Sequence, residues 1–264
     1  MPGSEPIITL TTDFGYQDHY VSAMKAVILN IQPSIRFVDV SHDIPAQDIM
    51  AGAWILKNSA FLYPKGTIHL AVIDPGVGTA RKPIILQLND HFFVGPDNGL
   101  FSLLCESGEV EAYEITNSEF MRKTVSVTFH GRDIFAPAAA HLAKGASLDE
   151  FGPRLDDINR YRWATPISDK EGIQGWVVHI DTFGNLITNI PKDMLTQNTS
   201  HELRIYAGTS ILHSIVTTYA SVAEGEAAAY IGSSDMLEIS VNKGNAGELL
   251  NIRKGAPVSV VFQK

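Results

Sequence analysis

Along the first 150 residues, short apolar runs alternate with segments in which apolar residues recur at every third or fourth position. Such an alternation predicts strands separated by helices, an order typical of a mostly parallel sheet flanked by helices. Val21, Met24 and Ile28 mark the first predicted helix, and Ile49 and Leu56 lie in the second. The predicted strands of this βαβαβ order are residues 7–11, 35–40 and 67–73.

The remainder of this half adds a hairpin and several further elements. Two apolar runs flank Asn89 and Asp90, a pair of turn-forming residues, and predict a β-hairpin. Another apolar run, over residues 125–129, predicts a strand that ends just before His130. The other predictions are a short helix over residues 100–106, a strand over residues 110–115 and a helix over residues 133–144.

The pattern changes after Gly152 and Pro153, where short β-rich runs are separated by Gly, Asn and Ser turns. We therefore expect a domain boundary within the polar stretch 156–171. The predicted architecture is an α/β N-terminal domain over residues 1–160 and a smaller all-β, barrel-like C-terminal domain over residues 170–264. The candidate strands of the second domain are residues 175–181, 186–190, 202–206, 210–215, 228–231, 237–241 and 257–262.

The composition is that of an ordinary globular protein. Of 264 residues, 45% are hydrophobic and 19% are charged, which is too apolar for a disordered chain. The net charge of −9 and the lack of a basic run argue against a nucleic-acid partner, whose phosphates need clustered Lys and Arg. The sign of the charge mildly favours a cationic or neutral small ligand.

The single cysteine, Cys105, excludes an intrachain disulfide framework and Cys-rich metal sites, and it fits a reducing compartment. No apolar run approaches the ~18 residues of a membrane span. The N-terminus lacks the basic and apolar regions of a signal peptide. We therefore expect a cytoplasmic protein with no membrane partner.

Asp74 is the first candidate for chemistry, because it interrupts an apolar run and is followed by a glycine-rich turn. Arg81 lies seven residues further on, and His130 stands at another junction of a loop with a helix. Together they supply an acid, a base and a cation at the ends of elements, where active sites of α/β folds gather. We interpret them as one group that orients and activates water, although Asp74 and Arg81 could equally form a structural ion pair and a lone histidine is more often structural.

Further polar residues follow other strands. Asp13 ends the first strand, where a carboxylate can accept hydrogen bonds from a ribose diol. Asp18 precedes the next helix, as a cap or first-turn acid or as a ligand contact. In the second domain, Phe183 can stack on a planar ring and the Asn185 amide can both donate and accept, although this phrase also fits an ordinary turn.

Seven phrases, taken in order, resemble those of the S-adenosyl-L-methionine (SAM) hydrolases, also called SAM hydroxide adenosyltransferases, which are related to the SAM-dependent fluorinase and chlorinase. The resemblance extends from about residue 7 to the C-terminus. The phrases are TTDFG (11–15), VDVSHDIP (38–45), IDPGVGTAR (73–81), GPDNG (95–99), TFHGRDIFAPAAAHLA (128–143), IDTFGNLITNI (180–190) and LEISVN (237–242).

The resemblance implies an α/β N-terminal domain, a β-rich C-terminal domain and a homotrimer that binds SAM between the N-domain of one subunit and the C-domain of the next. It implies SAM as the substrate, with no cofactor and no metal. Asp235 and Met236 depart from the pattern, which has Gly followed by an aromatic residue. The implied water-activating triad is Asp74, Arg81 and His130, and the implied substrate-binding residues are Asp13, Asp18, Asp181, Phe183, Asn185, Tyr219, Ser233, Glu238 and Val241.

The expected reaction is hydrolysis of SAM to adenosine and L-methionine by in-line attack of water on C5′. Asp74 would hold the water, His130 would take up its proton directly or by relay, and Arg81 would keep Asp74 ionised and fixed. The nearest alternative is a SAM-dependent halogenase, although halogenases carry other residues at the positions of Asp74 and His130. A non-catalytic SAM- or adenosine-binding protein is a second alternative, and metal-dependent phosphohydrolysis is a third.

Overall fold

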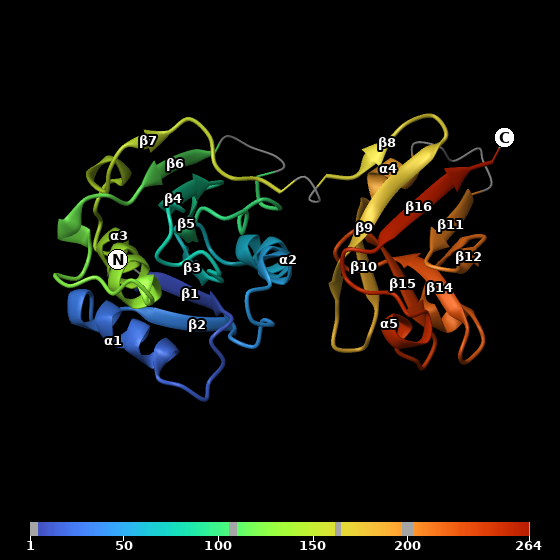
Figure 1. Cartoon of the computed structure of the whole chain (residues 1–264), viewed down its shortest axis with the longest axis horizontal. Coiled ribbons are helices and arrows are strands. Elements are labelled where there is room, and N and C mark those ends of the chain that lie inside the picture. The colour runs from blue at the N-terminus through green and yellow to red at the C-terminus, as the bar shows by residue number, and fades with distance from the viewer. Residues whose placement is uncertain (1–4, 106–109, 162–164, 197–202, 264) are drawn as a thin grey trace. The chain divides into compact units, whose positions relative to one another are not determined.

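The computed structural model describes residues 5–105, 110–161, 165–196 and 203–263. The chain divides into two compact units, Met1–Tyr161 and Arg162–Lys264. In Figure 1 the first unit runs from blue to yellow-green and the second from yellow to red. Each unit has its own sheet and its own hydrophobic core.

The N-terminal unit contains a seven-stranded sheet in the order β2-β1-β3-β5-β4-β6-β7. The pairings β2-β1, β1-β3 and β3-β5 are parallel, whereas β5-β4, β4-β6 and β6-β7 are antiparallel. The sheet is therefore mixed, and the prediction of a mostly parallel sheet holds only for the part β2-β1-β3-β5. The strands are β1 Ile7–Thr12, β2 Arg36–Ser41, β3 Ile68–Val72, β4 Pro83–Leu88, β5 His91–Pro96, β6 Glu111–Glu114 and β7 Arg154–Leu155.

A tight hairpin explains why the sheet changes direction. Asn89 and Asp90 join β4 to β5 with φ angles of 51° and 62°, the left-handed conformation of the two-residue turn that matches strand twist. The hairpin was predicted correctly. Because a two-residue loop can join only antiparallel strands, β4 and the strands beyond it depart from the parallel βαβ pattern.

Helices cover both faces of this sheet (Figure 1). Met24 and Ile28 of α1 pack in one core with Phe135, and Leu56 of α2 packs in the other core with Ile73. These helices follow the predicted apolar spacing. The α-helices are α1 Tyr20–Ile31, α2 Ile49–Ser59 and α3 Ala136–Ala143; the π-helix η3 Gly131–Phe135 precedes α3, and 3₁₀ turns occupy η1 Ala60–Leu62, η2 Ser118–Phe120 and η4 Leu148–Glu150.

Two local predictions were wrong. Residues 100–105 form successive turns and not a helix, since their backbone N–H groups bond three residues back, as in Ser102 to Gly99; Glu106 lies outside the described residues. Residues 125–129 form a loop and not a strand. There the Ser126 N–H donates to the Asp133 side chain at 2.8 Å, and Val127 is exposed.

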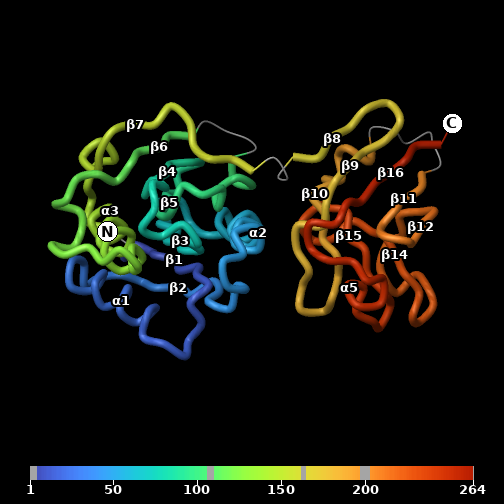
Figure 2. The backbone as a smooth tube through the Cα atoms, viewed as in Figure 1, coloured from blue at the N-terminus to red at the C-terminus, as the bar shows by residue number. Residues whose placement is uncertain are grey.

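The C-terminal unit is β-rich, with a nine-stranded sheet: eight strands follow the order β12-β11-β16-β9-β10-β15-β14-β13, and the ninth, β8, pairs with β9. Although β16 is last in sequence, it lies between β9 and β11 (Figure 2). Contacts between β12 and β14 bring the two ends of the sheet near each other, so the sheet curls as a barrel does. Its strands are β8 Ile167–Ser168, β9 Gly172–Ile180, β10 Leu186–Pro191, β11 Leu203–Ala207, β12 Ser210–Leu212, β13 Ile215–Val216, β14 Ala227–Ile231, β15 Met236–Val241 and β16 Pro257–Phe262.

The unit is not all-β, because two short helices, α4 Lys192–Thr196 and α5 Ala246–Leu249, and the 3₁₀ turn η6 Tyr219–Ser221 join its strands. The predicted strand 210–215 is divided into β12 and β13, and Glu202, predicted to begin a strand, lies outside the described residues. Among the helices of the described residues, none is both long and apolar enough to cross a membrane.

Candidate active site

Asp74, Arg81 and His130 lie in direct contact in the N-terminal unit. The Nε of Arg81 donates to both carboxylate oxygens of Asp74 at 3.0 Å, and its Nη2 donates to Oδ2. The same Nη2 lies 2.7 Å from Nδ1 of His130. The side chains of Arg81 and Asp74 are only 8% and 5% exposed, so this arrangement is largely shielded from water.

The contact between Arg81 and His130 defines the tautomer of the imidazole. A guanidinium carries only donors, so Nδ1 of His130 must accept and the neutral ring must carry its hydrogen on Nε2. Burial lowers the pKa of His130, and the positive charge of Arg81 lowers it further. His130 is therefore a neutral ring that offers an Nε2–H donor.

Glycines allow the turn between Asp74 and Arg81 to close. Gly78 has a φ of 76°, and a Cβ there would lie 2.5 Å from the carbonyl oxygen of Val127. A side chain at this position would push the turn away from the loop that carries His130. Gly78 thus allows the turn to pack closely against that loop.

Asp133 anchors the loop that carries His130. Its carboxylate is fully buried and accepts from Arg122, from two nitrogens of Arg132 and from the Ser126 N–H, at 2.6–2.8 Å. Burial opposes its ionisation, but these donors outweigh burial and lower the pKa of Asp133 to about 2. Sequence reasoning missed this residue, although a lone carboxylate at the start of a predicted apolar helix was a signal of a buried ion pair.

A cavity of about 570 Å³ opens beside these residues. Asp74 and His130 line it together with Asp13, whose Oδ2 accepts from the Gln47 N–H at 2.7 Å. Burial raises the pKa of Asp13, and the negative charge of Asp74 adds to this effect. The cavity wall also holds an aromatic cluster, Phe14, Tyr20 and Phe129, with ring centroids 5.1–6.0 Å apart.

Asp18 does not join this cavity wall. It is exposed, and the N-cap of α1 is His19 with no side-chain cap hydrogen bond. The first turn of α1 holds no acidic residue. The interpretation of Asp18 as a helix cap or first-turn acid is therefore wrong.

A second cavity, of about 670 Å³, lies in the C-terminal unit. The carboxylate of Asp181 closes the turn at its edge by accepting from the backbone N–H groups of Phe183 and Asn185 and from the Asn185 amide. Phe183 and Tyr219 are 77% and 50% exposed, which is unusual for large aromatic side chains. The residues that line this cavity are Asp181, Phe183, Asn185, Tyr219, Val241, Lys243, Gly244 and Asn245.

Glu238 and Ser233 lie outside the lining of that cavity. Burial raises the pKa of Glu238, and the nearby charge of Asp181 raises it further. Ser233 is exposed in the turn between β14 and β15. In the same turn Asp235 has a φ of 56°, so it adopts the left-handed conformation that a glycine would otherwise supply.

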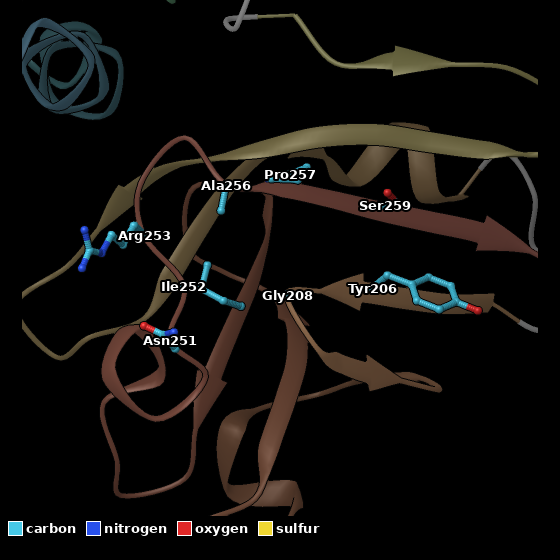
Figure 3. A pocket seen from close by; sticks show the side chains of 8 residues that line it. All are labelled: Tyr206, Gly208, Asn251, Ile252, Arg253, Ala256, Pro257 and Ser259. Atoms are coloured by element: carbon cyan, nitrogen blue, oxygen red, sulfur yellow. The ribbon is translucent and has the colours of Figure 1, made fainter.

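A third cavity, of about 510 Å³, involves none of the predicted residues. Figure 3 shows Tyr206 and Arg253 at opposite ends of it, with Ile252 between them. Arg253 is the single charged residue of its described lining. In the described part of the chain, no group of three or more His, Cys, Asp or Glu residues could hold a metal ion.

Comparison with known proteins gives the family. Residues 8–152 match the family model described as the SAM hydroxide adenosyltransferase N-terminal domain, and residues 175–259 match that of the C-terminal domain. The (R)-S-adenosyl-L-methionine hydrolase of Salinispora tropica is 37% identical over 95% of both chains. The protein of the same name from Thermus thermophilus is 36% identical over 95% of this chain and 97% of its own. A fluorinase from Nocardia brasiliensis is 28% identical over 98% of this chain and 97% of its own.

Two solved structures are similar to this chain over nearly its whole length. An uncharacterized conserved protein from Thermotoga maritima superposes with a TM-score of 0.87 at 36% identity, covering 96% of this chain and 99% of its own. A conserved hypothetical protein from Thermus thermophilus superposes with a TM-score of 0.79 at 33% identity, covering 98% of this chain and all of its own. The chain belongs to the SAM hydroxide adenosyltransferase family.

Proposed function

We propose that this protein hydrolyses SAM to adenosine and L-methionine by in-line attack of water on C5′ of the ribose. The observation that carries this proposal is the contact of Arg81 with both Asp74 and His130, which line one cavity. The (R)-S-adenosyl-L-methionine hydrolases at 36–37% identity support the same substrate and reaction. SAM serves as the substrate and no separate cofactor takes part.

The leaving group of this reaction needs no acid catalysis. Methionine departs as a neutral thioether, so it needs no proton from a general acid. The enzyme must instead align water behind C5′, and alignment can contribute about 7–11 kcal/mol in favourable cases. The approach of a partly negative oxygen to a sulfonium cancels charge, and a water-poor cavity strengthens that attraction.

We assign the proton of the attacking water to Asp74. Arg81 fixes both carboxylate oxygens; Oδ2 accepts from both Nε and Nη2, whereas Oδ1 accepts only from Nε and keeps a lone pair for the water. His130 would orient the water or the ribose by donating from Nε2. Uptake of the proton by His130, as first expected, would require Arg81 to release Nδ1, because Nε2 already carries a hydrogen.

The remaining predicted residues would bind the substrate. Asp13 would accept from the ribose hydroxyls, and the aromatic cluster Phe14, Tyr20 and Phe129 would exclude water. In the C-terminal cavity, Phe183 and Tyr219 would stack on adenine while Asn185 donates and accepts. Asp18, Asp181, Ser233, Glu238 and Val241 complete the proposed contacts to SAM.

We further propose a homotrimer in the cytoplasm. In it, the N-terminal cavity of one subunit and the C-terminal cavity of the next would share one SAM molecule. The division of the proposed contacts supports this, since water activation belongs to one cavity and the exposed aromatic pair to the other. Light scattering coupled to gel filtration tests the trimer; a monomeric mass for a fully active protein would contradict it.

The direct test is to incubate the purified protein with SAM and separate the products by chromatography. We expect adenosine and methionine in equal amounts. Asp74→Ala should abolish adenosine formation while SAM binding stays measurable by calorimetry. Undiminished turnover by this variant would remove Asp74 from the mechanism.

A further inference from the structure

A second buried histidine lies close to the proposed ribose site. His42 directly follows β2 and is 1% exposed. Its Nδ1 lies 2.7 Å from the hydroxyl oxygen of Thr12, the last residue of β1, which is fully buried. Its Nε2 faces Oδ1 of Asp39 at 3.2 Å.

The polarity of these contacts can be assigned. Asp39 is a carboxylate, held by Lys25 Nζ at 2.7 Å and by the Tyr16 hydroxyl at 3.2 Å. Its charge favours the hydrogen of the His42 ring on Nε2, although Nε2 makes no hydrogen bond of good geometry with the described part of the chain. Nδ1 is then an acceptor, and Thr12 donates to it. The Thr12 oxygen in turn accepts from the Phe14 N–H at 3.3 Å.

The hydrogen bonds of His42 reach residues on both sides of Asp13. Through its side chain, His42 contacts Thr12, whose hydroxyl oxygen accepts from the Phe14 N–H, and Thr12 and Phe14 flank Asp13. Through its backbone, the carbonyl oxygen of His42 accepts from the Gly15 N–H at 2.8 Å. His42 therefore holds the Asp13 turn on both sides and touches none of the residues assigned to water activation.

We propose that His42 is a positioning residue that, through Thr12, fixes the Asp13 carboxylate in the orientation that receives the two hydroxyls of a ribose. The inference rests on the proposed function only in its assignment of Asp13 to the ribose. A carboxylate binds a diol well when both of its oxygens are aligned with the hydroxyls. A displacement of about 1 Å in a site can lower the rate of an enzymatic reaction about 100-fold. A buried imidazole with defined donors and acceptors is a more rigid support than a loop alone.

The chain contains a matched control. Thr9 of β1 lies 2.8 Å from Nδ1 of His69, and both residues are as buried as Thr12 and His42. This pair joins β1 to β3 within the sheet, where Thr9 and His69 are paired in register. Loss of either threonine hydroxyl removes a buried Thr–His bond, but only Thr12 adjoins the Asp13 turn.

The experiment measures the ratio of the dissociation constants of 2′,3′-dideoxyadenosine and adenosine by calorimetry. We expect the wild type to favour adenosine, because only adenosine carries the diol. Thr12→Val and His42→Leu should reduce this ratio about tenfold or more, as expected when hydrogen bonds to a charged group are lost. His42→Asn should retain most of the ratio, since an amide oxygen can accept from Thr12 in place of Nδ1.

The control Thr9→Val should keep the wild-type ratio even where its thermal stability falls. An unchanged ratio in Thr12→Val would overturn the proposal, as would an equal loss in Thr9→Val or a wild type that does not distinguish the two nucleosides. Thr12→Val carries the test if His42→Leu does not fold. Adenosine release from SAM is measured separately. If the wild type prefers adenosine but releases none from SAM, the proposed hydrolysis is contradicted and the role of His42 is not. If it releases adenosine but the ratio is unchanged in Thr12→Val, the role of His42 is contradicted and the hydrolysis is not.

Discussion

Arg81 donates from Nη2 to Nδ1 of His130 at 2.7 Å, so one guanidinium holds both the carboxylate of Asp74 and the imidazole. Asp74 and His130, which both line the cavity, are thus oriented by a third side chain that is not part of its lining. Because Nδ1 is occupied, the ring can act at the cavity only through the Nε2–H. This relationship favours a hydrogen-bond donor over the proton acceptor that the sequence analysis expected of His130.

Substitution of His130 by glutamine tests this distinction. The glutamine amide nitrogen can take the place of Nε2 as a donor, but it cannot accept a proton. We expect His130→Gln to keep kcat within about tenfold of wild type, whereas His130→Ala, without the donor, should lose about 100-fold or more. Equal losses in the two variants, measured by adenosine release, would indicate that His130 is the base.

The acid limb of the pH profile provides a second test. Burial and Arg81 lower the pKa of His130 below its ordinary 6.5, while Asp74 and Asp133 act in the opposite direction. Protonation would place a hydrogen on Nδ1 facing the guanidinium and break the contact. Activity should therefore be complete at neutral pH and fall only below pH 6.5, through the lowered pKa. In His130→Gln this limb should vanish; a limb that persists unchanged in that variant belongs to another group, such as Asp13.

Asp133→Asn should destabilise the protein through the loop that carries His130. The change leaves two arginines without a buried carboxylate, a loss worth about 3 kcal/mol. Urea unfolding followed by circular dichroism measures this, with the exposed Asp149→Asn as a control that should change little. A loss no larger than that of the control would show that the loop does not depend on Asp133.

The same residue links stability to pH. Its folded pKa of about 2 lies below the ordinary 3.8, so its stabilising contribution is complete above about pH 4 and is lost as the pH falls toward 2. We expect the difference in unfolding free energy between wild type and Asp133→Asn to be constant from pH 7 to about pH 5 and to shrink below pH 4. A difference that grows on acidification would contradict the assigned direction of the shift.

Asp235 offers a prediction about the turn in which this chain departs from the family pattern. Its φ of 56° costs an ordinary side chain about 1–2 kcal/mol, and less for Asp. Asp235→Gly should therefore leave the melting temperature close to that of wild type, whereas Asp235→Val should lower stability by about 1–2 kcal/mol. Differential scanning calorimetry of both variants measures this. An unchanged stability of Asp235→Val would mean that the turn rearranges.

Local apolar spacing predicted the helices α1 and α2 and the strands around them, because Val21, Met24 and Ile28 face a core and their burial imposes the period. It failed at residues 125–129, where Val125 and Val127 are exposed and the Ser126 N–H donates to Asp133. The direction of β4 could be inferred from the hairpin, but the pairing of β4 with β6 could not, since it joins distant segments.

The candidate site shows the same limit. Asp74 and Arg81 are joined by one short turn, so their contact follows from local geometry. The approach of Arg81 to His130 spans 49 positions and depends on the packing of Gly78 against Val127, which no spacing encodes. The anchoring of the loop by Asp133 requires four converging donors from three residues and could be found only in three dimensions.

The fluorinase relatives make halide transfer the reaction most worth excluding. A halide that attacks C5′ would need to occupy the place assigned here to water, next to the carboxylate of Asp74, and like charges at contact distance repel strongly where water is scarce. Arg81 does not offset this repulsion at the cavity, because it does not line the wall and its Nε and Nη2 already bond Asp74 and His130. Incubation with SAM and an excess of chloride or fluoride, analysed by mass spectrometry, should yield adenosine and no 5′-halogenated nucleoside. Detection of a halogenated product that rises with halide concentration would show that an anion can displace the water, and the proposed role of Asp74 would have to be abandoned.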